Sequence, residues 1–479
     1  MIGAQQVVDL ALAEASRLGR ADETTVLVSD RVEATLRWAN NTMTTNGEST
    51  SRTTTVISIM RQGDKARVGT VRSSSADPAV IADLVAASQL AAAVAPQARD
   101  TAPPLPGGAA PADWDAPTPG TGAEVFLGVA GELARGFGGL SGGGGLSGGG
   151  GLSGGGGLSG IGATLFGYAR HVVETTFVAT SGGLRRRWTQ PTGSVEINAK
   201  HDGASAWVGT STPDFVSVPM DSMLDQLGTR LSWSRRIVEL PAGRYETIMP
   251  PSTVADMMIY LAWTMGGRGA QEGRTALAAP GGGTRVGEKL TSLPLTLYSD
   301  PGASGLECAP FVSTSSSSEQ TSVFDNGMTI DRVDWIREGV INALAYPRAA
   351  AAEFDTPVAA GADNLLMTGG SKSLQDMIAG TERGLLLTTL WYIREVDPSV
   401  LLLTGLTRDG VYLVEDGEVT AAVNNFRFNE SPLDLVRRAT QAGVSEFTLP
   451  REWGDWATRA QMPSLRIPDF HMSSVSQAQ

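Results

Sequence analysis

Apolar residues recur along the chain with two periods, one typical of helices and one typical of strands. Val8, Leu12, Ala15 and Leu18 follow helical spacing and predict a first helix. Four segments typical of strands and one alanine-rich segment typical of a helix follow. Together they predict an α+β domain over residues 1–99. Helices are expected at 5–18 and 78–95, and strands at 25–29, 32–39, 53–60 and 66–71.

A segment rich in Pro, Ala and Gly separates this domain from a second one. Residues 100–122 are expected to form a linker, and residues 123–232 a central α+β module. Glycine and proline dipeptides predict turns at Gly182-Gly183 and at Pro191-Thr192-Gly193. Helices are expected at 124–137 and 219–231, and strands at 172–179, 184–190 and 194–200.

The central module contains a repeat, GGGGLS, which recurs with a period of six over residues 138–160. Four consecutive glycines lose too much backbone entropy to hold a helix or a strand, so the repeat predicts a mobile loop. A specific glycine-rich recognition loop is one interpretation. A length-tolerant surface insertion is favoured, because added loop length costs little free energy.

Residues 233–479 predict a largely antiparallel β domain with a few helices, which makes the whole chain α+β. Residues 384–436 alternate apolar runs with turns, and the turn Glu415-Asp416-Gly417 has the sequence of a tight hairpin. Strands are expected at 235–240, 245–249, 385–394, 401–407 and 411–414, and a short helix at 433–440.

One helix of this domain matters for function, the segment 253–265 with the sequence TVADMMIYLAWTM. Its apolar residues recur as a continuous stripe at i, i+3, i+4, i+7, i+8 and i+11. Thr253 is expected to cap it, with Asp256 reaching back to the cap. The pattern therefore predicts a helix with one face in the core.

Composition narrows the possible functions. The formal charge of −13 disfavours nucleic-acid binding, because such a surface must neutralise phosphates. The run Arg185-Arg186-Arg187 is expected to be a solvated face. The chain has no apolar run long enough to span a membrane and no recognisable signal peptide. With its single cysteine, Cys308, it is expected to be cytoplasmic.

Residues 384–436 resemble the C-terminal core of the TldD/PmbA family, also named modulators of DNA gyrase, and the resemblance extends over most of the chain. In the peptidase subunit of that family, the helix at 253–265 carries HExxxH, in which two histidines hold zinc and the glutamate is the general base. Met258, Ile259 and Trp263 stand at the His, Glu and His positions here. A thioether, an aliphatic chain and an indole cannot form a hydrolytic zinc site.

No other motif replaces the missing zinc site. His171, His201 and His471 are isolated in the sequence, and each is expected to be a strand or surface residue. Cys308 has no neighbouring partner and does not match the family's C-terminal cysteine ligand, so it is expected to be a loop or buried thiol. We therefore expect no catalytic, metal-binding or cofactor-binding residue in this chain.

The resemblance implies a non-catalytic TldE/PmbA-type subunit of a heterodimer with a TldD-type metalloprotease. Zinc would lie in the partner, and the two subunits would enclose a chamber for unfolded or small peptides. The polar residues expected either to line that chamber or to bind loop backbone are Asn424, Asn425, Arg427 and Asn429. The alternatives are a homodimeric binding protein for a peptide or small molecule, an enzyme of another kind, and a regulator of gyrase.

Overall fold

The computed structural model describes residues 2–75, 77–140 and 162–476 of the 479-residue chain, and two sheets organise them. The first sheet has six strands in the order β3-β2-β1-β4-β5-β6, and every neighbouring pair is antiparallel. Its elements are α1 (Ala4–Leu18), β1 (Glu23–Ala39), β2 (Thr42–Gln62), β3 (Lys65–Ser73), α2 (Pro78–Val94), η1 (Ala123–Phe126), α3 (Leu127–Leu140), β4 (Thr164–Thr180), β5 (Arg185–His201), β6 (Ala204–Thr212) and α4 (Met220–Trp233).

The second sheet has fourteen strands and is mostly antiparallel, with parallel pairs at β12–β20, β8–β13 and β7–β17. This confirms the predicted α+β class with a largely antiparallel C-terminal part. Its elements are β7 (Ile237–Val238), β8 (Gly243–Met249), α5 (Pro251–Thr264), α6 (Gly267–Gln271), β9 (Leu297–Ser299), η2 (Val323–Asp325), β10 (Val333–Arg337), β11 (Val340–Ile341), α7 (Arg348–Glu353), β12 (Leu365–Met367), α8 (Leu374–Ala379), β13 (Arg383–Leu387), β14 (Leu390–Asp397), β15 (Leu402–Thr407), β16 (Val411–Glu415), β17 (Glu418–Val423), β18 (Phe426–Glu430), α9 (Pro432–Arg438), β19 (Gln441–Thr448) and β20 (Ala460–Val475).

The segments 1–99 and 123–232, predicted as separate modules, share the first sheet because β1 pairs with β4 along most of its length. The strands are longer than predicted, since 25–29 and 32–39 are one strand and 184–190 and 194–200 are another. The turn expected at Pro191 is absent. Pro191 pairs with Val173 of β4, and on its other side β6 begins pairing only at Gly193. On the β6 side Pro191 is therefore at an unpaired edge, a position in which a strand tolerates proline.

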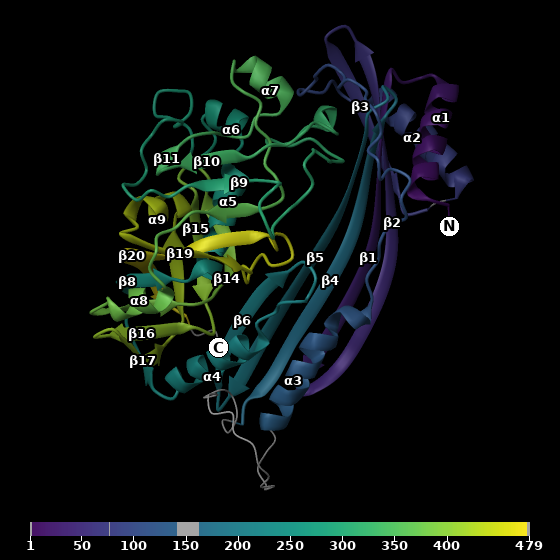
Figure 1. Cartoon of the computed structure of the whole chain (residues 1–479). Coiled ribbons are helices and arrows are strands. Elements are labelled where there is room, and N and C mark those ends of the chain that lie inside the picture. Colours follow the sequence, from purple (N-terminus) through teal and green to yellow (C-terminus); the bar gives the residue numbers. More distant parts are fainter. Residues whose placement is uncertain (1, 76, 141–161, 477–479) are drawn as a thin grey trace.

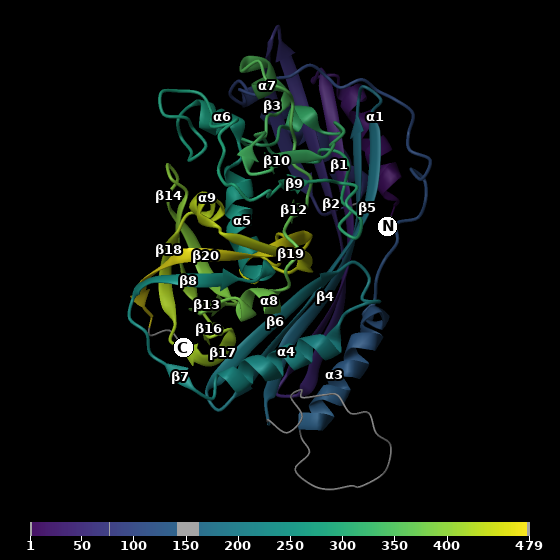
Figure 2. The same cartoon turned by 60° about the vertical axis from the view of Figure 1, so that its left-hand side comes forward.

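The helices of the first sheet lie on one of its faces, and the C-terminal part lies on the other (Figures 1 and 2). Val26 and Val28 of β1 pack with α1 and α2, and Ala34 of the same strand packs with α3 and α4. Leu27 points the opposite way and packs with Phe311 of the C-terminal part. The period of two along a strand therefore separates a helix-covered face from a face that looks toward the second sheet.

The segment 100–122 contains no helix or strand, but it is held against the first sheet. The buried Trp114 lies edge-on to Phe177, with ring centroids 5.3 Å apart. Arg187 is also buried and donates to the Pro117 carbonyl at 3.1 Å, and Arg186 donates to the Gly327 carbonyl. The prediction of a solvated arginine face was therefore wrong, because these side chains bind backbone carbonyls between segments.

Of the predicted repeat insertion 138–160, residues 138–140 belong to α3, and the remainder lies outside the described residues. Within the described ranges, no helix has the length and hydropathy to cross a membrane.

The C-terminal strands β13 to β16 form one long hairpin that bends in the middle. The predicted strand 385–394 is divided at Thr388 and Thr389, whose hydroxyls donate to the carbonyls of Gly410 and Arg408. This division separates β13–β16 pairing from β14–β15 pairing. The predicted tight turn is confirmed, since Asp416 and Gly417 both have positive φ, at 50° and 83°.

Candidate functional site: the cleft beside helix α5

Helix α5 lies in the core of the C-terminal part, but its N-terminus differs from the prediction. It begins at Pro251, where a proline needs no cap because it has no N–H. The buried Thr253 donates its hydroxyl to the Pro250 carbonyl at 3.0 Å. Asp256 does not reach back to the cap. Its Oδ1 accepts the N–H of Glu452 at 3.0 Å, from the loop 449–459 between β19 and β20.

The three positions predicted to correspond to the zinc motif are occupied by core and aromatic side chains. Met258 is fully buried and Ile259 is 3% exposed, both within the main apolar core. Trp263 is 47% exposed and lies edge-on to Tyr260 and Trp453, at centroid distances of 5.3 and 4.8 Å. None of the three supplies the nitrogen, oxygen or thiolate that zinc requires. These residues therefore do not fit the metal.

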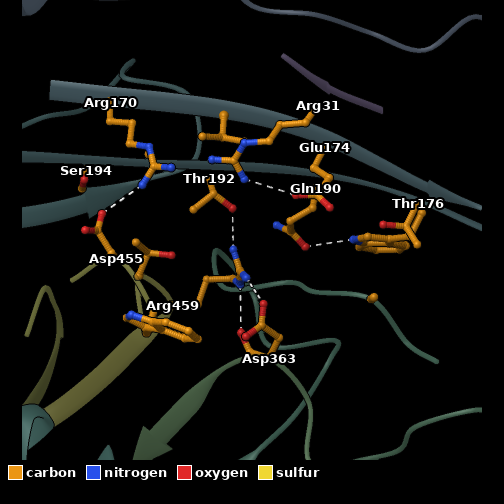
Figure 3. A pocket seen from close by; sticks show the side chains of 16 residues that line it. Arg31, Arg170, Glu174, Thr176, Gln190, Thr192, Ser194, Asp363, Asp455 and Arg459 are labelled. Carbon is orange, nitrogen blue, oxygen red and sulfur yellow. Dashed lines mark hydrogen bonds and ion pairs between the residues drawn. The ribbon is translucent and has the colours of Figure 1, made fainter. Parts of the chain in front are cut away.

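A cleft opens between the C-terminal part and the uncovered face of the first sheet (Figure 3). Its volume is about 290 Å³. Arg31, Arg170 and Glu174 line it from the first sheet, and Asp455 and Arg459 line it from the loop before β20.

Paired charges cross this cleft. Arg170 donates to Asp455 Oδ1 at 2.9 Å, and Arg459 donates to Thr192 Oγ1 of β5 and to Asp363 (Figure 3). The two parts of the chain are thus joined across the site.

A carboxylate of the first sheet also holds two of the arginines that line the cleft. Glu33 accepts hydrogen bonds from Arg31 at 2.8 Å and from Arg170 at 3.1 Å. Burial alone would raise the pKa of Glu33, but the two guanidinium groups outweigh it and hold that pKa below its usual range. The carboxylate is therefore ionised at neutral pH and keeps both arginines in position.

A second cavity, of about 180 Å³, adjoins the cleft and reaches helix α5. We call it the tryptophan pocket, because Trp263, Trp335 and Trp456 form much of its wall. Asp363, Trp456 and Arg459 line both the pocket and the cleft. A third cavity of about 350 Å³, with Phe447 in its wall, continues the cleft on the other side of Arg459. The three cavities therefore adjoin one another, since each shares lining residues with the cleft.

The four polar residues predicted to line a chamber lie outside the cleft. Asn424 and Asn425 follow β17, and Arg427 and Asn429 belong to β18. Asn424 Oδ1 accepts the N–H of Leu240 at 2.7 Å, and Asn425 Oδ1 accepts the Thr407 hydroxyl at 3.3 Å. Arg427 is exposed, and Asn429 lines a separate cavity that also contains Glu430 and Arg438. None of the four lines the cleft or the tryptophan pocket. Their role in a chamber stays a prediction.

His171 and Cys308 are buried structural residues. His171 is buried in β4, where its ring nitrogens contact Thr121 Oγ1 at 2.6 Å and the Pro213 carbonyl at 2.8 Å. Burial lowers the pKa of His171, so the ring is neutral at pH 7. Cys308 is also buried, which raises the pKa of its thiol to about 11. Within the described ranges, no three His, Cys, Asp or Glu side chains gather as a metal site would require.

Sequence reasoning missed the charged face of the first sheet. The signal was present, because Arg170, Glu174 and Thr176 alternate with buried residues along β4. A strand with a polar face opposite an apolar face normally exposes the polar side to solvent. Only the position of the C-terminal part turns that face into a wall of the cleft.

Known proteins share this architecture. A profile of the PmbA/TldA metallopeptidase C-terminal domain matches residues 242–474, and comparison with curated protein sequences gives no match. TldE from Thermococcus kodakarensis is similar in structure, with a TM-score of 0.75 and 16% identity over 97% of this chain and 99% of that chain. A protein from Bacteroides thetaiotaomicron, provisionally named a modulator of DNA gyrase, gives a TM-score of 0.73 and 14% identity over 99% and 100%.

A protein of the same provisional name from Thermotoga maritima gives a TM-score of 0.71 and 14% identity over 98% of this chain and 100% of that chain. The fold and the matched domain define the class, an α+β protein whose C-terminal part is metallopeptidase-like. Residues 242–474 match the PmbA/TldA C-terminal domain, and the overall fold of the chain is similar to that of TldE.

Proposed function

We propose that this chain is a non-catalytic subunit of TldE/PmbA type, which pairs with a TldD-type metalloprotease subunit in the cytoplasm. The partner carries the zinc ion and performs hydrolysis. This chain contributes the cleft between its two sheets to a chamber that admits unfolded or small peptides. It does not itself bind zinc, nucleic acid or a membrane.

The observation that carries the proposal is the chemistry of helix α5. Helix α5 is the segment predicted to match the zinc-binding helix of the peptidase subunit, but Met258 is buried in the core, Ile259 lies between the core and the tryptophan pocket, and Trp263 packs on two aromatic rings. A hydrolytic zinc site needs three protein ligands and an open position for water. The helix therefore supports packing and cleft shape rather than hydrolysis.

The polar residues of the cleft suit an extended peptide. Side chains of alternating sign line the space, including Arg31, Glu174, Asp455 and Arg459. Such groups supply both donors and acceptors for peptide N–H and C=O groups. A folded domain is too large for cavities of about 180 to 350 Å³, whereas two or three residues of an extended chain fit.

Co-expression with a TldD-type subunit from the same genome tests the proposal. We expect the two chains to co-elute on size exclusion, with about one zinc ion for each pair and none on this chain alone. The pair should cleave an unfolded peptide, and chelation should abolish cleavage. Stoichiometric zinc on the isolated chain, or chelator-sensitive cleavage by it, would contradict the proposal. A stable homodimer that ignores the candidate partner would favour a separate binding protein.

A further inference from the structure

The tryptophan pocket leaves large apolar side chains uncovered inside the cleft. Trp456 is 75% exposed and Trp263 is 47% exposed, and both line this open pocket. Trp335 is buried and completes the indole wall, and Ile259 contributes an aliphatic surface from α5. Contiguous apolar surface inside a concave site commonly marks ligand binding.

The wall of the pocket is held in position. Trp263 packs on Tyr260 and Trp453, and the Tyr260 hydroxyl donates to the Ile393 carbonyl at 2.6 Å. Gln320, from the rim, donates to the carbonyls of Ala262 and Trp263 at 2.8 and 2.9 Å. The Ala262 carbonyl also accepts the N–H of Met265 at 3.2 Å, and the second bond adds an acceptor contact for the Trp263 carbonyl at the end of α5. The α5 side of the pocket is therefore fixed by packing and hydrogen bonds.

The size and the indole wall of the tryptophan pocket favour an aromatic side chain as its occupant. A cavity of about 150 Å³ can hold a benzene molecule, and the tryptophan pocket, whose wall combines indoles with polar side chains, measures about 180 Å³. Aromatic rings gain additional attraction from edge-to-face contacts with indoles. A lysine or arginine side chain could also lie against an indole, but the Asp363 carboxylate in the pocket wall is already paired with Arg459 and leaves no free counter-charge there for a second cation.

The pocket opens where the peptide backbone would run. Asp363, Trp456 and Arg459 belong to both cavities, so a chain bound in the polar cleft passes the mouth of the pocket. We propose that the tryptophan pocket binds one aromatic side chain of an extended peptide whose backbone lies in the adjoining cleft. This inference rests on the proposed peptide-binding function and specifies its substrate. Of the three helix positions predicted to match the zinc motif, Ile259 and Trp263 line this pocket, whereas Met258 is buried in the core.

Calorimetric titration of the full chain with matched pentapeptides tests the inference. The probe is acetyl-Gly-Ser-Phe-Ser-Gly-amide, compared with versions that carry Ala, Leu or Lys in place of Phe. We expect the Phe peptide to bind at least about tenfold more tightly than the Ala peptide, because a buried ring removes apolar surface from water. The Leu peptide should lie between them, and the Lys peptide should bind no better than the Ala peptide.

Two substitutions assign the binding to the pocket. Ala362 lines the pocket, so Ala362→Leu should fill part of it and reduce affinity for the Phe peptide about tenfold. Ala352→Leu makes the same change at an exposed position on α7 and should leave affinity unchanged. Trp263→Ala should weaken binding, and Trp263→Phe should restore part of it. Thermal melts of each variant confirm that it is folded.

Equal binding of the Phe, Leu and Ala peptides would overturn the inference, as would binding that Ala362→Leu leaves intact, or no binding of the Phe peptide. These outcomes are separate from the test of the proposed function. A chain that forms the zinc-containing pair but shows no aromatic preference refutes only the pocket. A chain that prefers the Phe peptide but ignores the TldD-type subunit refutes only the pairing.

Discussion

The backbone N–H of Glu452 donates a 3.0 Å hydrogen bond to Oδ1 of Asp256, which joins the loop 449–459 to the middle of helix α5. Asp256 is fully buried, and its second oxygen has no hydrogen-bond partner within the described part of the chain. The same loop carries Asp455, Trp456 and Arg459 into the cleft. One buried carboxyl group therefore helps to position the residues that connect the cleft with the tryptophan pocket.

Asp256 should make stability depend on pH. Burial raises the pKa of Asp256 well above its ordinary range, with a smaller contribution from the nearby Glu452 carboxylate. The folded state therefore holds a proton that the unfolded state releases near pH 3.9. This stabilising contribution is complete below about pH 3.9 and is lost as pH rises toward the raised pKa, at up to about 1.4 kcal/mol per pH unit.

Asp256→Asn should remove this dependence, because an amide keeps the Oδ1 acceptor without ionising. We expect urea unfolding to show the variant gaining stability over the parent as pH rises from 4 to 8. Asp202→Asn, at a side chain that is 89% exposed, serves as the matched control. Parallel stability curves for the parent and Asp256→Asn would refute the explanation.

Helix α5 should not tolerate restoration of the zinc-motif glutamate. Ile259 is 3% exposed within the main core, so Ile259→Glu would bury a carboxyl group without a partner. We expect the free energy of unfolding to fall by about 3 kcal/mol or more at pH 7, measured by urea titration. Ile259→Val, a control that keeps the site apolar, should cost about 1 kcal/mol. A stable Ile259→Glu variant would mean that the helix still accepts the motif.

The close packing of helix α2 against β3 should depend on Gly69. A Cβ atom there would lie 2.2 Å from the backbone N of Ala92 and from the carbonyl oxygen of Ser88. Gly69→Ala must therefore push α2 away from the sheet, and we expect a loss of about 3 kcal/mol in thermal or urea unfolding. Gly128→Ala is the matched control, because its Cβ would meet no atom within 4 Å. It should be neutral or slightly stabilising, since alanine favours a helix.

The single cysteine should be unreactive in the folded chain. Cys308 is 1% exposed, and burial raises the pKa of its thiol to about 11. At pH 8 its thiolate fraction should be roughly 100-fold below that of an unfolded thiol, before access is considered. Alkylation by iodoacetamide, followed by mass spectrometry, should be correspondingly slow until guanidinium unfolds the protein. An Ala352→Cys variant supplies an exposed thiol for comparison, and equal rates at both cysteines would contradict this prediction.

The local spacing of apolar residues predicted the presence of helices and strands more reliably than it predicted where they begin and end. Helix α5 follows from its apolar stripe, but its start at Pro251 does not, because Asp256 binds a residue 196 positions away. Likewise, Pro191 has the sequence of a turn and lies within β5. The sheet tolerates Pro191 because β6 pairs with β5 only from Gly193 onward. The local sequence around Pro191 does not reveal where that pairing ends.

For the candidate site, the sequence by itself determined what is missing: residues 258, 259 and 263 carry no zinc-binding group, whatever the fold around them. The tertiary structure alone decided what is present. It brought Arg31 and Arg170 of the first sheet to Asp455 and Arg459 of the last loop, and it left three indoles around one cavity. Ligand chemistry belongs to single side chains, whereas a cleft arises from contacts between segments hundreds of residues apart, which local periodicity cannot encode.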